Sequence, residues 1–289
     1  CYTSGTTGNP KGVLYSHRST LLHAFSVLTI PGMNLGEESA VLPVVPMFHV
    51  NAWGVPYFAP MVGAKIVFPG PKLDGESLAE LINNEGVTEA WGVPTVWLGL
   101  LGHMRKTEQK FTSLKRVLIG GSAAPRAMMR EFQEKYGVEG LQGWGMTEMS
   151  PIGTVSMIRP KDADLPLDRQ FDIKAKQGRA VFGVEMKIVN DDGQALPRDG
   201  KSFGELLVRG PAIISGYYEN PEASAKAFDS EGWFRTGDVS KIDPEGYMEI
   251  VDRTKDVIKS GGEWISSIDL ENEAVGHPEI AEAAVIAVH

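Results

Sequence analysis

Cysteine is almost absent from this sequence, which holds only Cys1 among 289 residues. A single cysteine excludes an intrachain disulfide framework and fits a reducing compartment, so we expect a cytoplasmic protein. The sequence also lacks any run of about twenty apolar residues, so we expect no transmembrane segment. It shows no signal peptide either.

Basic residues are outnumbered in this chain. Lys and Arg total 28 against 37 Asp and Glu, which gives a formal net charge of −9. Binding to a nucleic-acid backbone needs clustered Lys and Arg, so we expect no nucleic-acid partner, although a local pocket for one nucleotide stays compatible. With 42% apolar and 22% charged residues, the composition is that of a globular protein. The length suffices for roughly two domains.

The two ends of the sequence have unusual patterns. The chain begins with Cys1 rather than Met, and a motif follows at once. The last residues, Ala283–His289, have the pattern of a strand that stops abruptly. We therefore expect the sequence to be an internal piece of a longer protein.

The segment Tyr2–Gly12 combines one Ser, three Thr, three Gly and one Lys. Glycines allow tight turns whose exposed N–H groups form a concave nest for an anion. The hydroxyls add neutral donors, and Lys11 adds a mobile positive charge suited to phosphate. This composition indicates a polyphosphate-binding loop.

A flexible surface linker is the alternative for this segment, because Ser, Thr and Gly are common in linkers. Apolar Val13 and Leu14 follow directly, and Pro10-Lys11-Gly12 gives the loop a stiff exit. The segment is not the common P-loop, which needs Ser or Thr after its Lys, whereas Gly12 follows Lys11 here.

Residues 1 to about 150 alternate between strand and helix patterns. The predicted strands are Val41–Val45, Lys65–Phe68, Thr88–Val93, Arg116–Ile119 and Gly140–Trp144. The predicted helices are Leu73–Asn84, Pro94–Met104 and Pro125–Tyr136. This alternation predicts an α/β fold with a mostly parallel sheet covered by helices on both faces. Ligands of such sheets bind beyond the carboxyl ends of the strands, which directs attention to Pro46–Trp53, Gly120–Pro125 and Trp144–Ser150.

The pattern changes after residue 150. Residues 151–175 have little periodicity and read as a long surface connection. Short strands and turns follow, with a helix at Pro221–Phe228, and predict an antiparallel or β-barrel-like subdomain. We predict an α/β part at 1–175, a β-rich subdomain at 176–251, a hinge at 252–256 and the start of a small α/β domain at 257–289. The last part is expected to hold a helix near Ser267–Val275 and the strand Ala283–Val288.

Four further segments carry side chains suited to chemistry. In Gly143–Glu148, Trp144 could lie against a planar ring and Glu148 could bind Mg²⁺, which prefers oxygen ligands; an ordinary helix start is the alternative. His49 lies among apolar residues, where a packed core histidine is the alternative. Asp238 could accept hydrogen bonds from two ribose hydroxyls, or it could be a β-turn residue. The charge run 252–256 could be a solvated surface.

Tyr-Thr-Ser-Gly-Thr-Thr-Gly-x-Pro-Lys-Gly at 2–12 closely resembles the phosphate-binding signature of the adenylate-forming superfamily. That superfamily includes acyl-CoA synthetases, peptide-synthetase adenylation domains and beetle luciferases. Four later motifs resemble it in the same order, at 46–53, 143–148, 233–238 and 252–264. The resemblance covers essentially the whole chain, and the versions at 46–53 and 258–266 are similar to those of medium- and long-chain fatty acyl-CoA synthetases.

The resemblance implies roles for residues of the first half. Lys11, Thr147, Glu148 and His49 are expected to be catalytic, with Mg²⁺ held by Glu148 and Thr3. Trp144 takes the place of the adenine-stacking Tyr, a departure that removes the phenol hydroxyl. The implied nucleotide contacts are Thr3, Ser4, Gly5, Thr6, Thr7, Gly8, Lys11, Gly121, Gln142, Gly143, Trp144 and Thr147. The implied contacts to the carboxylic acid are His49, Val50, Trp53, Gly121 and Gly145, with Trp53 as the gate of an acyl tunnel.

The resemblance also implies roles in the second half. Asp238 would bind the ribose, Arg253 would lie near the ribose and phosphate, and Lys255 would mark the hinge about which the small domain rotates. Gly262 would border the pantetheine path of CoA. Lys259 and Trp264 complete the implied nucleotide contacts.

The expected activity is that of an AMP-forming acyl-CoA synthetase using ATP, Mg²⁺ and CoA. A short thioether acid such as 3-(methylthio)propionate is an alternative substrate, and an amino-acid adenylation domain or a nucleotide-binding module without catalysis are alternative functions. The resemblance implies a catalytic Lys at a position beyond His289, so we expect the 289 residues alone to bind nucleotide weakly and adenylate poorly. The sequence leaves acyl-chain length and oligomeric state open, with a homodimer as one option.

Overall fold

The structure is a computed structural model that describes residues 1–3, 9–253, 258–260, 263–265, 267, 270, 271, 274, 280 and 283–285. Residues 258–260 and 263–265 are described by their backbone. The predicted contacts at Ser4, Gly5, Thr6, Thr7, Gly8, Lys255 and Gly262 lie outside the described residues, as do the side chains of Lys259 and Trp264.

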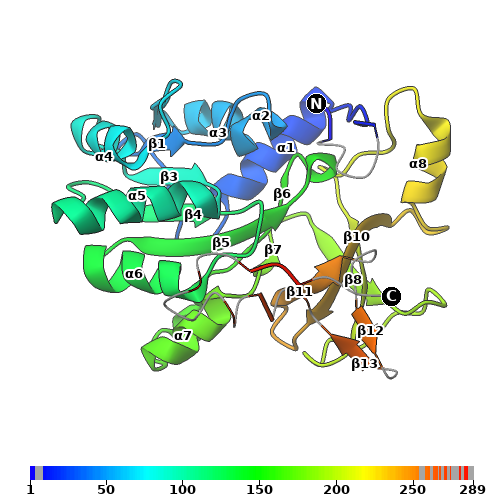
Figure 1. The fold of residues 1–289 in the computed structure, drawn as a ribbon. Coiled ribbons are helices and arrows are strands. Elements are labelled where there is room, and N and C mark those ends of the chain that lie inside the picture. The colour runs from blue at the N-terminus through cyan, green and yellow to red at the C-terminus, as the bar shows by residue number, and fades with distance from the viewer. Residues whose placement is uncertain are drawn as a thin grey trace. The chain divides into compact units, whose positions relative to one another are not determined.

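The chain divides into two compact units (Figure 1). Unit 1 comprises Cys1–Val184 and Gly210–Ala225, and unit 2 comprises Glu185–Arg209 and Lys226–His289. The chain thus leaves unit 1, forms two strands of unit 2, and returns to unit 1 for residues 210–225. The domain boundaries expected from the sequence stay predictions.

Unit 1 is built on a seven-stranded sheet in the order β2-β1-β3-β4-β5-β6-β7. Strands β1 to β5 pair in parallel, whereas β6 and β7 pair antiparallel. The strands are β1 (Ala40–Pro43), β2 (Lys65–Ile66), β3 (Glu89–Gly92), β4 (Arg116–Ile119), β5 (Glu139–Gly145), β6 (Ile152–Val155) and β7 (Arg179–Ala180). The order 2-1-3-4-5 is that of a doubly wound sheet, with its topological switch point between β1 and β3.

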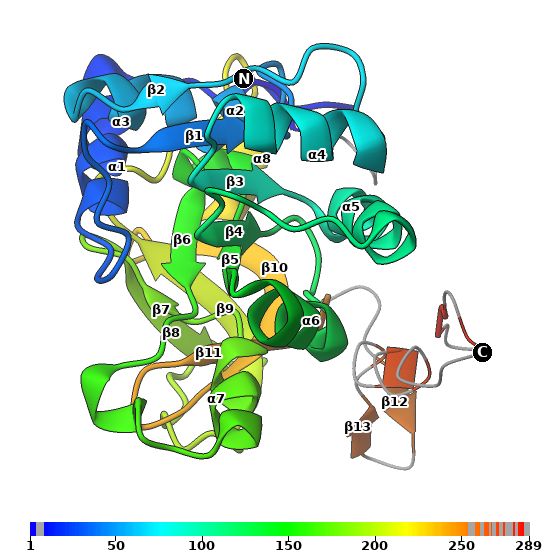
Figure 2. The ribbon, with the colours of Figure 1, turned by 90° about the vertical axis from the view of Figure 1, so that its left-hand side faces the viewer.

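Helices cover both faces of this sheet, as the sequence predicts (Figure 2). The helices of unit 1 are α1 (His17–Leu28), α2 (Val50–Trp53), α3 (Val55–Met61), α4 (Gly75–Asn84), α5 (Pro94–Thr107), α6 (Arg126–Tyr136), α7 (Leu167–Lys174) and, reaching into unit 2, α8 (Pro221–Ala227).

The two helical layers follow from the two-residue repeat of the strands. Leu42 of β1 and Val117 of β4 join the core formed with α4, α5 and α6. Their neighbours Val41 and Leu118 point the other way and pack with α1 and α3. Because both faces are buried, these strands read as continuous apolar runs, which is why the sequence reveals them.

Residues 151–175 do not form the surface connection expected from the sequence. Strand β6 is fully buried, a 3₁₀ turn occupies Pro160–Asp162, and α7 packs Phe171 into the core. The prediction was wrong because an antiparallel strand of four residues, Ile152–Val155, contains Gly153 and Thr154 and gives little periodic signal.

Unit 2 contains a four-stranded antiparallel sheet in the order β11-β10-β9-β8. Its strands are β8 (Glu185–Val189), β9 (Phe203–Arg209), β10 (Phe234–Ile242) and β11 (Met248–Arg253). The antiparallel character predicted for this region is confirmed. The described strands form an open order in which β8 and β11 are the edges.

The last part of the chain is described only in places. Strands β12 (Ile258–Ser260) and β13 (Glu263–Ile265) pair antiparallel. Residues 267, 270, 271 and 274 are helical, in agreement with the predicted helix, whereas residues 283–285 of the predicted last strand lie outside any strand.

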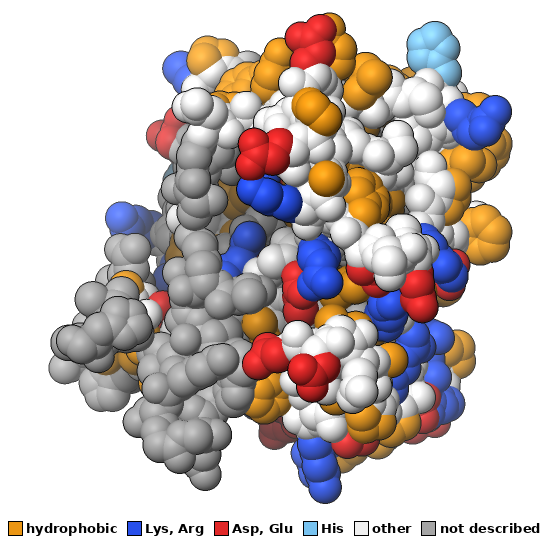
Figure 3. All heavy atoms as spheres, turned by 90° about the vertical axis from the view of Figure 1, so that its right-hand side faces the viewer, with side chains coloured by type: hydrophobic (Ala, Val, Ile, Leu, Met, Phe, Trp, Pro, Cys, Tyr) orange, Lys and Arg blue, Asp and Glu red, His pale blue; other side chains and the backbone are white. Residues whose placement is uncertain are grey.

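Two further features of the described residues are the apolar content of the helices and the distribution of charge. None of the helices in the described part of the chain has the length and apolar content that a membrane crossing needs. On the face drawn in Figure 3, described Lys and Arg side chains are interspersed with Asp and Glu side chains. That face therefore has a mixed charge pattern.

Candidate active site

The two ends of the predicted phosphate loop pair with each other. Tyr2 and Gly12 form an antiparallel bridge, and the Thr3 N–H donates to the Lys11 carbonyl at 3.0 Å. The Lys11 N–H donates in return to Oγ1 of Thr3 at 3.0 Å. The loop thus begins and ends on one short hairpin, which fixes the backbone from which Lys11 projects.

A segment of residues 212–218 joins this loop to the motif at 143–148. The Tyr218 N–H donates to the Gly12 carbonyl at 2.9 Å, and Tyr217 pairs with Val13. At its other end the Ile214 N–H donates to the Glu148 carbonyl at 3.0 Å. Two motifs far apart in sequence are therefore attached to one short piece of backbone.

Tyr217 is the side chain that links the two motifs. Its hydroxyl donates to Oε1 of Glu148 at 2.8 Å, and the Nζ atom of Lys11 lies 4.8 Å from the centre of its ring. Both Tyr217 and Glu148 are buried. Burial, and then the Glu148 carboxylate, raise the pKa of the Tyr217 hydroxyl, so it stays protonated and can donate.

Tyr15 holds the same motif from another direction. Its hydroxyl donates to the Thr147 carbonyl. Burial and the nearby Glu148 raise the pKa of this hydroxyl as well. Sequence reasoning missed both tyrosines, because neither belongs to a segment with a recognisable pattern.

The predicted nucleotide contacts of β5 lie at its carboxyl end. Gln142 is buried, and its Oε1 accepts from the Ala124 N–H at 3.3 Å. Trp144 is 9% exposed and packs against Gly153, where an added Cβ would lie 2.8 Å from the indole Cζ3. At Gly145 an added Cβ would lie 2.1 Å from the Pro151 carbonyl oxygen, so this position accepts only glycine. Stacking of Trp144 on adenine stays a prediction.

The turn at the carboxyl side of β1 is left-handed. The φ angles of Val50, Asn51, Ala52 and Trp53 lie between +49° and +57°. Four consecutive residues with a Cβ in this region are rare, because each brings its Cβ close to the following carbonyl. Such strain persists where the surrounding structure enforces it and is common at functional sites.

The predicted acid-binding residues lie on and next to this turn. His49 begins the turn and is exposed, so the alternative of a packed core histidine is wrong. Trp53 is buried, and its indole is so close to Gly120 that an added Cβ there would lie 2.9 Å from the ring. Gly121 has φ +83°, which favours glycine. The structure thus brings Trp53 and Gly120 together at the carboxyl edge of the sheet.

In unit 2, Asp238 and Arg253 face each other across β10 and β11. They are partners in the strand register, and Oδ1 of Asp238 lies 2.9 Å from Nε of Arg253. Asp238 is 3% exposed and follows Gly237, whose φ of +75° accompanies a bulge in β10. Asp238 is therefore a strand residue and not a β-turn residue.

Comparison with known protein families shows which family the chain belongs to. The model of the AMP-binding enzymes matches residues 1–218. The chain belongs to the AMP-binding enzyme family.

Two curated relatives of this family member are similar along nearly all its length. A medium-chain-fatty-acid–CoA ligase of Ectopseudomonas oleovorans is 55% identical over 287 residues, which is 99% of this chain and 52% of the relative. A 3-methylmercaptopropionyl-CoA ligase of Ruegeria lacuscaerulensis is 54% identical over 288 residues, 100% of this chain and 53% of the relative. The chain thus spans about half the length of these relatives.

A solved structure shows the same fold for this part of the family. The O-succinylbenzoate coenzyme A synthetase of Bacillus subtilis in complex with ATP and a magnesium ion has a TM-score of 0.83 and 29% identity. The match covers 99% of this chain and 56% of that one.

The two residues predicted to bind Mg²⁺ offer oxygen ligands of the kind that this ion prefers. Glu148 offers a buried carboxylate, and Thr3 offers a hydroxyl oxygen. The described residues contain no cluster of three or more His, Cys, Asp or Glu that could hold a metal alone. One carboxylate completed by substrate phosphates and water is the common arrangement for Mg²⁺.

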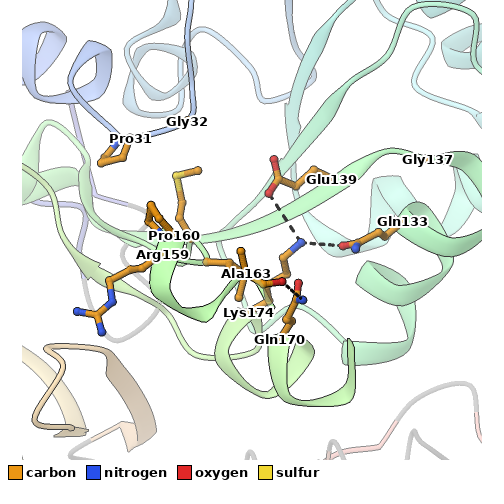
Figure 4. Close-up of a pocket in the computed structure, with 12 residues that line it drawn as sticks. Pro31, Gly32, Gln133, Gly137, Glu139, Arg159, Pro160, Ala163, Gln170 and Lys174 are labelled. Carbon is orange, nitrogen blue, oxygen red and sulfur yellow. Dashed lines mark hydrogen bonds and ion pairs between the residues drawn. The ribbon is translucent and has the colours of Figure 1, made fainter. Parts of the chain in front are cut away.

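A separate cavity of about 550 Å³ lies away from these motifs (Figure 4). It is lined by Glu139 at the amino end of β5, by Met157 and by Lys174 of α7, among others. The Lys174 amine points between Glu139 and Gln133 and lies 2.7 Å from Oε1 of Gln133. The site predicted from the sequence is therefore not this cavity.

Proposed function

We propose that the full-length protein containing this chain is an ATP-dependent, AMP-forming acyl-CoA synthetase. A carboxylate oxygen of the acid attacks the α-phosphorus of ATP, and the bond to the bridging oxygen breaks to release pyrophosphate. The thiol of CoA then attacks the acyl carbonyl and releases AMP, which yields the thioester. The proposal extends to ATP, Mg²⁺, CoA and a carboxylic acid as ligands and to a cytoplasmic protein, with a homodimer as one option.

The observation that carries the proposal is the common contact of Lys11 and Glu148 with Tyr217. It puts a mobile cation and a buried carboxylate beside the same ring at the ends of two motifs. A polyphosphate chelated to a divalent cation is complementary to such a pair. The sequence identity of 54–55% to two acyl-CoA ligases also supports the proposed activity.

Each predicted residue has a task in the first step. Lys11 and the hydroxyls of the phosphate loop would hold the departing phosphates, and their fixed charges and dipoles would stabilise the transition state. Glu148 and Thr3 would bind Mg²⁺, which supplies charge neutralisation on the phosphates. His49 would position the acid carboxylate, and Thr147 would contact the α-phosphate.

The remaining predicted contacts belong to nucleotide and CoA binding. Asp238 would accept from the ribose hydroxyls, and Arg253 would lie near the ribose and phosphate. Rotation about the hinge at Lys255 would exchange the two steps, a gating motion of the kind that assembles many active sites.

A medium- or long-chain fatty acid is the acid that we propose first, because the relative with 55% identity is named for a medium-chain acid. A short thioether acid is the second candidate, because the 54% identical relative is a 3-methylmercaptopropionyl-CoA ligase. Either acid would meet His49, Val50 and Trp53, and the mechanism would be the same.

Carboxylate-dependent exchange of pyrophosphate into ATP by the full-length protein tests the proposal. The panel holds short, medium and long fatty acids, 3-(methylthio)propionate and amino acids, each with and without CoA. We expect exchange with one acid class and thioester formation with CoA. Glu148→Gln should lower exchange at least a hundredfold, whereas Lys106→Gln, at an exposed position of α5, should not change it. If the protein binds ATP but catalyses exchange with none of the acids, the proposal that it is an acyl-CoA synthetase is contradicted.

A further inference from the structure

We propose that Tyr217 is a positioning residue that keeps Lys11 and Glu148 apart and orients the Glu148 carboxylate for a metal ion. This inference rests on the function proposed above. It concerns a residue outside all the motifs that the sequence analysis singled out.

The position of Tyr217 is fixed by its backbone. Tyr217 forms a β-bridge with Val13, and its N–H donates to Oγ of Ser224 at 2.8 Å. The Ser224 hydroxyl donates in turn to the Asn220 carbonyl at 2.7 Å. A ring held by the loop on one side and by the start of α8 on the other has little freedom to follow its neighbours.

The hydroxyl of Tyr217 occupies one oxygen of Glu148 and leaves the other available. The hydrogen bond to Oε1 measures 2.8 Å, and the exposed fractions are 9% for Tyr217 and 6% for Glu148. Among the described contacts, this hydroxyl is the side-chain donor of that carboxylate. Hydrogen bonds to ligating carboxylates fix their orientation, and loss of such a partner typically weakens metal binding 10–100-fold.

Tyr217 contacts opposite charges with its ring face and its hydroxyl. The Lys11 ammonium lies against the ring at 4.8 Å from its centre, where the negative face of the aromatic system attracts a cation. Among the described residues, no ion pair joins Lys11 to Glu148. In a direct ion pair, the ammonium and the carboxylate would neutralise each other. By contacting Tyr217 instead, the ammonium stays available for phosphate and the carboxylate for the metal.

The backbone of Glu148 is held independently of this hydroxyl. Its carbonyl accepts from the Ile214 N–H at 3.0 Å, and the preceding carbonyl of Thr147 accepts from the Tyr15 hydroxyl. Removing the Tyr217 hydroxyl should therefore change the orientation of the carboxylate and leave the loop in place. This separation makes a specific test possible.

The test compares Tyr217→Phe, Tyr217→Leu and Tyr218→Phe in the full-length protein. Tyr218 is the exposed neighbour, so its Phe variant is the matched control for loss of a hydroxyl. Calorimetry measures ATP binding in EDTA and then the Mg²⁺ concentration needed to enhance that binding. Thermal midpoints establish that each variant folds.

We expect Tyr217→Phe to raise the half-saturating Mg²⁺ concentration about tenfold or more, with ATP binding in EDTA within about twofold of wild type, because the ring still faces Lys11. Tyr217→Leu should weaken ATP binding in EDTA as well, and Tyr218→Phe should match wild type. An unchanged Mg²⁺ requirement in Tyr217→Phe, or an equal loss of binding with and without Mg²⁺, would overturn the proposal. Because this readout is binding, failure of the wild type to catalyse exchange would count against the proposed function alone.

Discussion

Glu89 and Arg116 lie side by side at the amino edge of the parallel sheet, with Oε1 of Glu89 2.9 Å from Nη1 of Arg116. They are register partners on β3 and β4, and Glu139 is the partner of Arg116 on β5, at 3.0 Å. Lys174 lies 3.8 Å from Glu139. A row of alternating charges therefore closes the edge of the sheet opposite the predicted catalytic loops.

The Glu89 carboxyl gives this row a pH dependence. Burial raises its pKa from the ordinary 4.5 to about 7, against the opposing effect of Arg116. The folded state therefore keeps this proton to a higher pH than the unfolded state does. The contribution of protonation to the free energy of unfolding is complete below about pH 4.5 and is lost as the pH rises through 7. At about 1.4 kcal/mol per pKa unit, the loss is roughly 3 kcal/mol. Glu89→Gln should remove this contribution, so the difference between the urea midpoints of wild type and variant should change from pH 5 to 8, and a constant difference would contradict the assignment.

His23 should produce a slope of the opposite sign. It is 2% exposed, and its Nε2 accepts from the Ile152 N–H at 2.9 Å. Burial lowers its pKa from 6.5 to about 4, so the stability that it contributes is complete above pH 6.5 and is lost as the pH falls through 4.

Between pH 4.5 and 6.5 the contributions of Glu89 and His23 change stability in opposite directions. The stability of the wild type should therefore change little with pH over this interval. His23→Gln, whose amide oxygen can still accept a hydrogen bond, should lower stability as the pH rises over this interval, because the effect of Glu89 then stands alone. Urea midpoints at four pH values decide the matter. If the stability of His23→Gln changes as little with pH as that of the wild type, the assignment for His23 is contradicted.

The fold was predictable where burial and sequence pattern agree. The buried strands β1 and β4 appear as apolar runs, and the amphipathic helices α4 and α6 are found within two residues of their ends. Helix α1 escapes prediction because its buried face includes His23 and Ser26, whereas Leu21 and Phe25 are exposed. A helix with polar residues on its buried face and apolar residues on its exposed face lacks the apolar periodicity from which an amphipathic helix is predicted.

The candidate site was predictable where one short segment carries the chemistry. Lys11 and Glu148 each belong to such a segment, and the structure joins them through one side chain. Tyr217 could not be found from the sequence, because its role depends on a bridge to Val13 across most of the chain. The left-handed turn at Val50–Trp53 was equally hidden, since β-branched and aromatic residues disfavour positive φ.

The left-handed turn predicts an unusual response to glycine. Ala52, with φ +49°, and Ala59, within α3, are both 0% exposed, so the same methyl is lost at either site. Glycine relieves about 1–2 kcal/mol of left-handed strain at 52, but it costs about 1 kcal/mol in a helix interior at 59. Ala52→Gly should therefore be about 2–3 kcal/mol more stable than Ala59→Gly in equilibrium urea unfolding. A difference of only about 1 kcal/mol, which is the helix cost alone, would show that the turn carries no strain.

Gly145 should couple local packing to catalysis. Its missing side chain leaves room for the Pro151 carbonyl, which an added Cβ would approach to 2.1 Å, and the same carbonyl accepts from the Met146 N–H at 3.1 Å. Gly145→Ala must push this carbonyl away, so we expect a loss of about 1–3 kcal/mol in stability, as for other overpacked sites.

Because Thr147 and Glu148 follow directly, the same shift should lower kcat/KM with Mg-ATP at least tenfold, read in the exchange assay with the best acid of the panel. Gly102→Ala is the matched control, since an added Cβ on that part of α5 meets nothing within 4 Å. It should stabilise the helix by about 1 kcal/mol and leave exchange unchanged. If Gly145→Ala exchanges pyrophosphate within twofold of wild type, the position of residues 147–148 does not depend on this contact.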